Sequence, residues 1–300
     1  MKLAASIASW GIDFAEHPDN VSWLVVLDEI AQSGLRDLEL GPVGYTPTAS
    51  VRSELDRRGL QAIGAWLVLP LSSSREEIEA ASSVEPTLDM IAASGGAHVI
   101  LIDRAHGERA LTAGRSTAAR RLTKDERKLF ARNVLEIADL ARQRKLDVTF
   151  HPHTATFVEF EDEIEWLLEA TASEGLRLCL DTGHLLWAGM DPAEMLRRHA
   201  NVLGHIYLKD LDRDQVTAAC AKELGYWDAI EAGAFCPIGA GSVSFTAVAT
   251  ALEEISYQGA ATIEQDRAPA DWPQALPQLQ ESIAYLQTAL GKRLLGSCLD

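Results

Sequence analysis

Histidine and acidic residues follow several short apolar stretches of this sequence. They gather in four segments, His151-Pro152-His153, Asp181-Thr182-Gly183-His184, His205 to Asp210, and Glu264 to Arg267. In an extended strand, residues two apart point to the same side, so His205 shares a face with Tyr207 and Lys209. Imidazoles and carboxylates together suit a divalent ion such as Mn, Fe, Co or Zn. The pattern predicts a metal-dependent site where these segments meet.

Most of these residues also have a structural interpretation. Asp181 can simply cap the turn into a following helix, and the two histidines around Pro152 can be hydrogen-bonded core residues. Glu264 is harder to explain in this way, because burying an unpaired carboxylate at the end of an apolar strand is unfavourable. Glu39 and Lys209 remain open between a site role and an ordinary ion pair or surface position.

Apolar stretches alternate with helical patterns along the whole chain. The predicted strands are Lys2–Ser9, Leu35–Leu40, Leu60–Leu69, His98–Asp103, Asp147–His153, Leu176–Asp181, Val202–Asp210 and Ala260–Asp266. The predicted helices lie near 20–33, 47–58, 74–94, 123–145, 159–173, 191–199, 243–257 and 272–290. Eight strand–helix units in 300 residues are typical of a single-domain (β/α)8 TIM barrel. An open doubly wound sheet usually has a glycine-rich phosphate turn after its first strand, which residues 9–13 do not form.

The residue types at several predicted helix boundaries agree with this division into strands and helices. Gly34, Gly59 and Gly175 each stand where a helix is expected to end and a strand to begin. Asp191 precedes Pro192 as an N-cap precedes a first-turn proline. In such a barrel the polar segments fall at the C-terminal strand ends, where active sites form.

Two connections are unusually long, residues 104–122 and 211–241, and both are expected over the C-terminal mouth of the barrel. Loops of this length commonly act as lids or binding loops, although a solvated insertion or an oligomer contact would also explain them. The first carries five arginines that suit an anionic group, namely Arg104, Arg109, Arg115, Arg120 and Arg121. Four tryptophans near loop ends either form an apolar wall for a ring or merely pack, namely Trp10, Trp66, Trp187 and Trp227.

Composition excludes several classes of function. With 27 Lys and Arg against 44 Asp and Glu, the net charge of −17 disfavours binding to nucleic acid and to anionic membranes. A 47% apolar content excludes a mainly disordered chain. Polar residues interrupt the N-terminal apolar stretch, which therefore predicts a strand and not a signal peptide. The four scattered cysteines, Cys179, Cys220, Cys236 and Cys298, predict a reducing cytoplasm without disulfides.

The motifs LCLDTGHLLWAG at 178–189 and HIYLKDL at 205–211 resemble those of xylose isomerase-like TIM barrels. Within that family the inosose dehydratase branch is most similar, through SWGIDF, LELGPVGY, FHPHTAT and AGAFCPIGAGSVSF. Members hold one divalent ion through Glu, Asp, His and Glu on strands five to eight. The resemblance maps these ligands onto His151, Asp181, His205 and Glu264, with His153 as a substitute. Two positions depart from the pattern, since His151 replaces a glutamate and Tyr207 stands where the second histidine of HxHLKD is usual.

The resemblance implies a lyase of polyol catabolism that dehydrates a polyhydroxy ketone such as 2-keto-myo-inositol through an enediolate. Candidates for the base are Glu39, His153 and His184, and Lys209, Tyr207 or a histidine would donate the proton. Trp66, Tyr207 and Arg267 are expected to contact the substrate. The alternatives are a keto-sugar isomerase or epimerase, an enzyme that acts by β-elimination on 3-keto-glycosides, and a degenerate barrel that serves as a binding subunit. Relatives often pair, so a homodimer is also an expectation.

Overall fold

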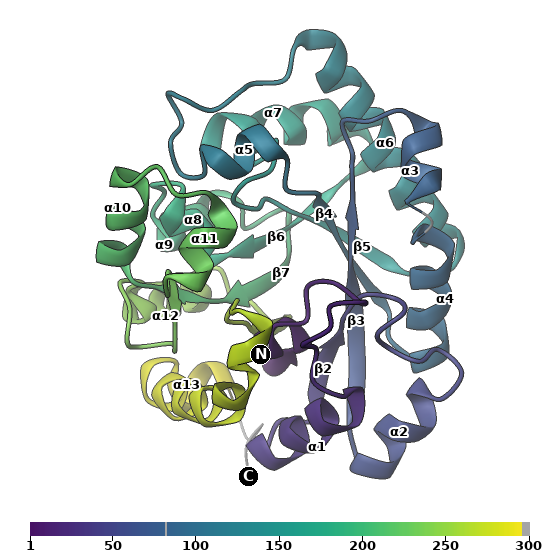
Figure 1. Ribbon diagram of the computed structural model, residues 1–300, viewed down its shortest axis with the longest axis vertical. Coiled ribbons are helices and arrows are strands. Elements are labelled where there is room, and N and C mark those ends of the chain that lie inside the picture. The colour runs from purple at the N-terminus through teal and green to yellow at the C-terminus, as the bar shows by residue number, and fades with distance from the viewer. Residues whose placement is uncertain (82, 296–300) are drawn as a thin grey trace.

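The computed structural model describes residues 1–81 and 83–295, and its centre is a closed parallel barrel (Figure 1). The barrel strands are β1 (Lys2–Ser6), β2 (Asp37–Leu40), β3 (Gln61–Leu69), β4 (His98–Asp103), β5 (Asp147–His151), β6 (Arg177–Asp181), β7 (Leu203–Leu208) and β10 (Ala260–Ile263). They pair in chain order, and β10 closes the ring against β1. The (β/α)8 TIM barrel prediction is therefore confirmed.

Helices surround this barrel in the alternation that the sequence predicts. The outer helices are α1 (Trp23–Ser33), α2 (Val51–Arg58), α3 (Arg75–Ala80), α4 (Val84–Ser94), α6 (Lys124–Gln143), α7 (Glu161–Thr171), α9 (Pro192–Arg198), α12 (Phe245–Glu254) and α13 (Ala275–Ala289). Shorter elements that the sequence did not predict are η1 (Ile7–Trp10), α5 (Gly107–Leu111), α8 (Thr182–Trp187), α10 (Arg213–Ala221), α11 (Tyr226–Glu231), η2 (Ala172–Glu174), η3 (Pro269–Gln274) and α14 (Gly291–Leu295). The small ribbon of β8 (Asp210–Leu211) and β9 (Phe235–Cys236) completes the fold.

Four predicted strands run too far at their C-terminal ends. The first strand stops at Ser6, whose hydroxyl accepts from the Ala8 amide at 3.3 Å and starts the 3-10 helix η1. The fifth stops at His151, because the chain turns and the His153 amide donates to the Val158 carbonyl at 3.0 Å. As a result His153, Lys209 and Glu264 stand on the rim just beyond their strands.

The capping residues that the sequence predicts are present at the helix ends. Gly34, Gly59 and Gly175 adopt left-handed conformations, with φ of 91°, 65° and 62°, as the glycine pattern predicts. Asp191 caps α9, since its carboxylate accepts from the Glu194 amide at 3.0 Å. The predicted helix near 74–94 is two helices, and each begins after its own serine, Ser74 or Ser83.

Replacing the Asp191 cap should have a small and specific effect. We expect Asp191→Ala to lower the free energy of unfolding by about 1 kcal/mol, because the Glu194 amide loses its acceptor. Asp191→Ser should retain most of the stability, since serine caps comparably well. Urea denaturation of both variants checks this, and equal losses in the two would contradict a capping role.

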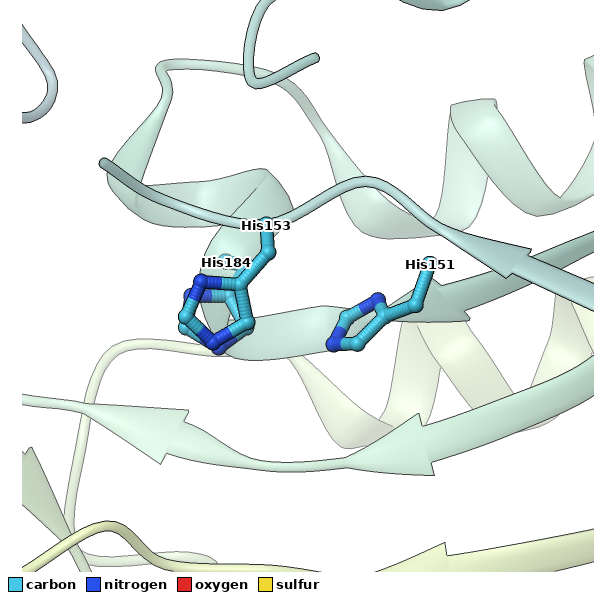
Figure 2. A group of neighbouring side chains, drawn as sticks. All are labelled: His151, His153 and His184. Atoms are coloured by element: carbon cyan, nitrogen blue, oxygen red, sulfur yellow. The ribbon is translucent and has the colours of Figure 1, made fainter. Parts of the chain in front are cut away.

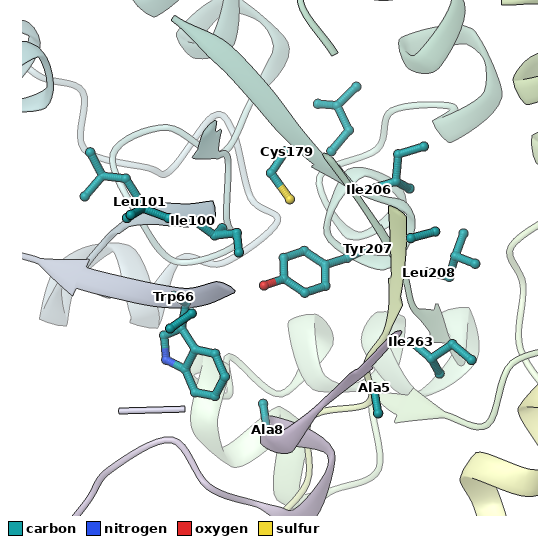
Figure 3. Close-up of a cluster of buried hydrophobic side chains, with 14 of the residues drawn as sticks. Ala5, Ala8, Trp66, Ile100, Leu101, Cys179, Ile206, Tyr207, Leu208 and Ile263 are labelled. Atoms are coloured by element: carbon teal, nitrogen blue, oxygen red, sulfur yellow. The ribbon is translucent and has the colours of Figure 1, made fainter. Parts of the chain in front are cut away.

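Side chains fill the inside of the barrel. Figure 3 shows Tyr207 projecting inward from β7 toward Trp66, with Cys179 and Ile100 beside it. Tyr207 and Cys179 are almost completely buried. His205 precedes Tyr207 by two residues on β7, so its side chain also points inward and lies one layer deeper.

The two long connections pack against each other in an apolar cluster of their own. This rim cluster consists of Ala113, Ala155, Trp187, Leu211, Val216, Ala219, Tyr226, Ala229, Ile230, Ala234 and Phe235. Under it, Arg109 is fully buried and donates to Glu163 at 2.7 Å and to Glu159 at 3.1 Å. Arg121 also pairs with Glu163 at 2.7 Å. Arg109 and Arg121 thus join the connection 104–122 to Glu163 of α7. Arg104 is exposed and lines the pocket described below.

In the part of the chain that the structure describes, no helix combines the length and apolar character needed to span a membrane. Cys179, Cys220 and Cys236 carry free thiols, and Cys298 lies outside the described residues.

Candidate active site

The deepest polar layer of the barrel centres on Glu39 of β2, a fully buried carboxylate. Its Oε1 atom accepts from the Thr262 hydroxyl at 2.5 Å and lies 2.8 Å from His205 Nε2. Its other oxygen accepts from the Tyr207 hydroxyl. His205 Nε2 also lies 2.9 Å from Thr262 Oγ1. This network engages both oxygens of Glu39, the predicted base, and the Nε2 atom of His205, a predicted metal ligand.

Above this layer three imidazoles meet. One ring nitrogen from each of His151, His153 and His184 lies within 4.8 Å of the other two. In Figure 2 the rings of His153 and His184 overlap, and the ring of His151 points toward them from β5. The ring centroids of His153 and His184 are 3.8 Å apart. The structure thus brings together two residues expected as catalytic and one expected as a ligand.

Hydrogen bonds fix which nitrogens of the imidazoles carry protons. His151 Nδ1 lies 3.3 Å from the Cys179 carbonyl and His153 Nδ1 2.7 Å from the Thr154 carbonyl, so both Nδ1 atoms donate. Their Nε2 atoms therefore hold lone pairs. The His151 Nε2 atom is buried and has no hydrogen-bond partner among the described residues. The His184 Nε2 lone pair accepts from Lys209 Nζ at 3.0 Å, so the Nδ1–H of His184 donates to the Thr154 hydroxyl at 2.9 Å.

Burial keeps the three imidazoles neutral. It lowers the pKa of His151 and of His184 well below the usual value, and the neighbouring His153 and Lys209 act in the same direction. Burial and the Lys209 charge also lower the pKa of His153 to about 4. Neutral imidazoles are the form that binds metals, and three of them suit a borderline divalent ion. The three side chains lie close enough together to hold a metal ion, once Lys209 releases the lone pair of His184 Nε2.

Lys209 is the cation at the centre of the site, and its side chain is fully buried. Its Nζ atom lies 2.7 Å from Glu264, 3.0 Å from Asp266 and 3.5 Å from Asp181. Burial opposes the ammonium charge, but the three carboxylates outweigh it and hold the pKa of Lys209 well above its usual value. The carboxylates that the sequence assigned to a metal therefore surround an ammonium group in this structure.

Three acidic groups of this site, Asp13, Asp181 and Glu264, hold protons more tightly than free carboxylates do. Burial raises the pKa of Asp181 to about 6, although Lys209 and the backbone amide of His184 oppose the rise. Burial and repulsion from Asp266 also raise the pKa of both Asp13 and Glu264. Lysozyme shows the general principle that burial can keep a carboxyl protonated near neutral pH. Asp13 and Glu264 can therefore exchange protons with a bound molecule.

A cavity of about 640 Å³ opens above these groups at the C-terminal mouth. Its lining includes Asp13, Trp66, His151, His153, Tyr207, Tyr226, Glu264 and Asp266. Of the remaining predicted site residues, His184 and Lys209 lie behind this lining and are linked to it by the contacts above. Arg267 is mostly buried and is not among the described residues that line the cavity. Asp181 does cap α8, since its Oδ1 accepts from the Gly183 amide at 2.7 Å, while its Oδ2 faces Lys209.

Sequence reasoning missed several residues of this site. Asp13 follows η1 in a loop, where no strand periodicity marks it. Tyr226 begins α11, and its hydroxyl donates to Asp266 at 3.0 Å. Asp266 is two residues after Glu264 and therefore shares its face. This spacing was the one signal in the sequence that could have identified Asp266 as a site residue. Among the four tryptophans, Trp66 and Trp227 line the cavity, whereas Trp10 is buried and donates to Glu29 at 2.6 Å, and Trp187 belongs to the rim cluster.

A closed barrel with polar strand ends facing a mouth cavity defines a TIM barrel of the enzyme type. The chain belongs to the xylose isomerase-like TIM barrel family, whose model matches residues 5–289. An inosose dehydratase of Clostridium tetani is 27% identical over 245 residues, which cover 81% of this chain and 82% of the relative.

Solved structures resemble the fold at lower identity. L-ribulose 3-epimerase superposes with a TM-score of 0.72 at 15% identity, covering 97% of this chain and 95% of that one. The IOLI protein, solved with a bound zinc atom, superposes with a TM-score of 0.73 at 13% identity, covering 99% of this chain and 100% of that one. These structures support the fold, and the curated relatives of similar length include inosose dehydratases.

Proposed function

We propose that this chain is a lyase that dehydrates a polyhydroxy ketone such as 2-keto-myo-inositol. The observation that carries the proposal is the mouth cavity, whose lining joins the imidazoles of His151 and His153 to the carboxyls of Asp13, Glu264 and Asp266. The similarity to an inosose dehydratase over most of the chain supports this choice of substrate. The free thiols of the described cysteines support our further proposal of a reducing, cytoplasmic location.

The reaction removes a proton from the carbon beside the ketone and expels hydroxide from the next carbon as water. Asp13 and Glu264 are the groups suited to this proton transfer, because their pKa values are raised toward the working pH. The ionised member of the pair accepts the carbon-bound proton, and the protonated member donates to the leaving hydroxyl. Lys209 holds Glu264 and Asp266 in place, and from behind the cavity lining it supplies positive charge that favours the developing enediolate.

His151, His153 and His184 are the residues that would hold a divalent ion in this site. The unpartnered His151 Nε2 atom, within the described part of the chain, supports this assignment. When bound, the ion supplies Lewis-acid polarisation of a substrate carbonyl. His205 is engaged with Glu39 and Thr262 one layer deeper, and Lys209 contacts Asp181 and Glu264. Lys209 also donates to His184 Nε2, so metal binding by all three imidazoles requires Lys209 to release that lone pair. The Nε2 atom of His151, unpartnered among the described residues, favours the imidazoles as the ligand set.

The direct test is proton NMR of 2-keto-myo-inositol incubated in D2O with the protein and Mn2+ or Co2+, after removal of protein and metal. We expect a dehydrated diketone, and its loss when a chelator is present. Deuterium at the carbon beside the ketone without dehydration would instead favour an isomerase or epimerase, which shares the first step. An unchanged spectrum from a metal-loaded protein would contradict both and favour a binding subunit.

The ligand assignment has its own prediction. After dialysis against Co2+, we expect His151→Ala to retain at least tenfold less metal than the wild type, because one of three ligands is gone. Elemental analysis measures the bound metal. His17→Ala is the matched control, since His17 lies in the loop before α1 and bonds the Asp19 amide. Equal metal content in His151→Ala and the wild type would contradict the imidazole site.

A further inference from the structure

One imidazole lone pair of the candidate site is already in use. The Nδ1–H of His184 donates to the Thr154 hydroxyl at 2.9 Å, so Nε2 is the nitrogen of this ring that holds a lone pair. That lone pair accepts a hydrogen bond from Lys209 Nζ at 3.0 Å. A single lone pair cannot serve an ammonium hydrogen and a metal ion at once, so the two exclude each other at His184.

Lys209 can give up this hydrogen bond and stay in the site. Its backbone is fixed, because its amide donates to the Thr182 hydroxyl at 2.9 Å and its carbonyl accepts from the same hydroxyl at 2.7 Å. Its Nζ atom has further partners in Glu264 at 2.7 Å and Asp266 at 3.0 Å. The ammonium can therefore turn away from His184 while it remains charged and paired.

Gly183 of α8 determines the path of the Lys209 side chain. A Cβ atom at position 183 would lie 2.8 Å from Lys209 Cγ and 3.1 Å from its Cβ and Cδ, so the lysine stem lies directly against the glycine backbone. Gly183 does not have a positive φ, and the contacts are with a flexible side chain. Alanine can therefore be accommodated at this position if the lysine moves.

We propose that Lys209 competes with a divalent ion for His184 Nε2, along a path that Gly183 leaves open, and so controls how readily this site takes up metal. The inference rests on the proposed function, since it concerns the regulation of the same imidazole site. On loading, Lys209 releases His184 and stays with Glu264 and Asp266, so a hydrogen bond is exchanged for a coordination bond and no proton is lost. Because full coordination needs the free lone pair, the apparent affinity falls with the fraction of protein in that state.

Two variants test the competition by different routes. Lys209→Met removes the ammonium, whereas Gly183→Ala keeps it and displaces the stem that carries it. By isothermal titration calorimetry of the metal-free proteins with Co2+, we expect both variants to bind about tenfold more tightly than the wild type, because a charge-assisted hydrogen bond no longer occupies the lone pair. Gly183→Ala carries the test by itself if Lys209→Met does not fold.

Each variant has a matched control. Lys222→Met removes a lysine at the exposed C-terminal end of α10. Gly107→Ala fills open space at the start of α5, where no atom from elsewhere in the described chain lies within 4 Å of the added Cβ. Both controls should bind Co2+ with the affinity of the wild type.

Several results would overturn the competition. Gly183→Ala with the affinity of the wild type is one of them, and tighter binding in Lys209→Met alone would show that the ammonium merely repels the ion. In the wild type labelled with 15N-histidine, Zn2+ should shift the Nε2 resonances of His151, His153 and His184 together. A shift confined to His151 and His153 would show that Lys209 keeps the His184 lone pair.

These results can be told apart from failure of the proposed function. Binding of Co2+ is measured without substrate, so an unchanged substrate spectrum in the NMR test leaves the competition standing. Absence of Co2+ binding in the wild type and in both variants would instead contradict the imidazole site, and the competition with it.

Discussion

Replacing Lys209 by methionine should abolish activity and lower the free energy of unfolding by about 3–5 kcal/mol near pH 8. The ammonium contacts Asp181, Glu264 and Asp266, and methionine of similar length leaves these carboxylates without a cation. Removing one partner of a buried ionic cluster is strongly destabilising because the remaining charges stay buried. Circular dichroism during urea denaturation measures the loss, and the NMR assay measures turnover.

The pH dependence of this variant gives a second check. In the wild type the pKa of Asp181 is already raised from 3.8 to about 6 by burial, and Lys209 opposes that rise. Without Lys209 the folded-state pKa rises further above the unfolded value. The stability that protonation gives is then present at low pH and is lost as pH rises through the folded pKa. We therefore expect a smaller destabilisation at pH 5 than at pH 8.

The control for Lys209→Met is Lys222→Met, at the exposed C-terminal end of α10. This variant should unfold within about 0.5 kcal/mol of the wild type at every pH. A Lys209→Met protein as stable as the wild type at pH 8, or equally destabilised at both pH values, would show that Lys209 does not neutralise the carboxylates.

Glu39→Ala should destabilise the protein by about 3–5 kcal/mol, because buried polar groups lose their acceptor in the barrel interior. The hydroxyls of Tyr207 and Thr262 both donate to Glu39, and His205 Nε2 lies 2.8 Å from it. All four side chains are almost completely buried, so water cannot easily replace the carboxylate. Urea denaturation of the variant measures the loss.

Glu39→Gln is the informative comparison, since the amide retains an acceptor oxygen of similar shape. We expect it to lose less than half as much stability as Glu39→Ala. A double-mutant cycle with Tyr207→Phe should then show that the effects of Glu39→Ala and Tyr207→Phe are not additive, because both remove the same hydrogen bond. Strictly additive losses would show that the bond contributes nothing.

The barrel itself could be predicted from the sequence because each strand–helix unit carries its own local signals. Gly34, Gly59 and Gly175 end helices in the left-handed conformation, and apolar periodicity marks the strands between them. The meeting of polar strand ends was predictable for the same reason, since parallel strands present their C-terminal ends at one mouth. Short helices such as α8 and α11 carry too few turns to show a period.

The depth of each side chain inside the barrel could not be predicted. The two-residue periodicity of a strand tells which face a side chain points to. It does not tell how high that side chain lies along the barrel axis. Heights depend on how neighbouring strands are staggered, and β6 pairs with β7 through a register shift at Leu178 and Cys179. His205 consequently meets Glu39 below Tyr207, while Lys209, two residues beyond Tyr207, reaches Asp181 and Glu264.

The separate rim cluster has a consequence for how this chain can diverge. Its residues come from the two long connections, from Ala155 in the loop after β5 and from Trp187 of α8, and they form a packing unit distinct from the core beneath the outer helices. Substitutions in this unit can reshape the opening of the cavity without disturbing the packing of the parallel strands. Tyr226 and Phe235 contact Asp266 and Lys209, so these two positions are constrained. Substitutions at the other rim positions can change which molecules enter while the catalytic residues keep their positions, so descendants of this chain can acquire new substrates through rim mutations.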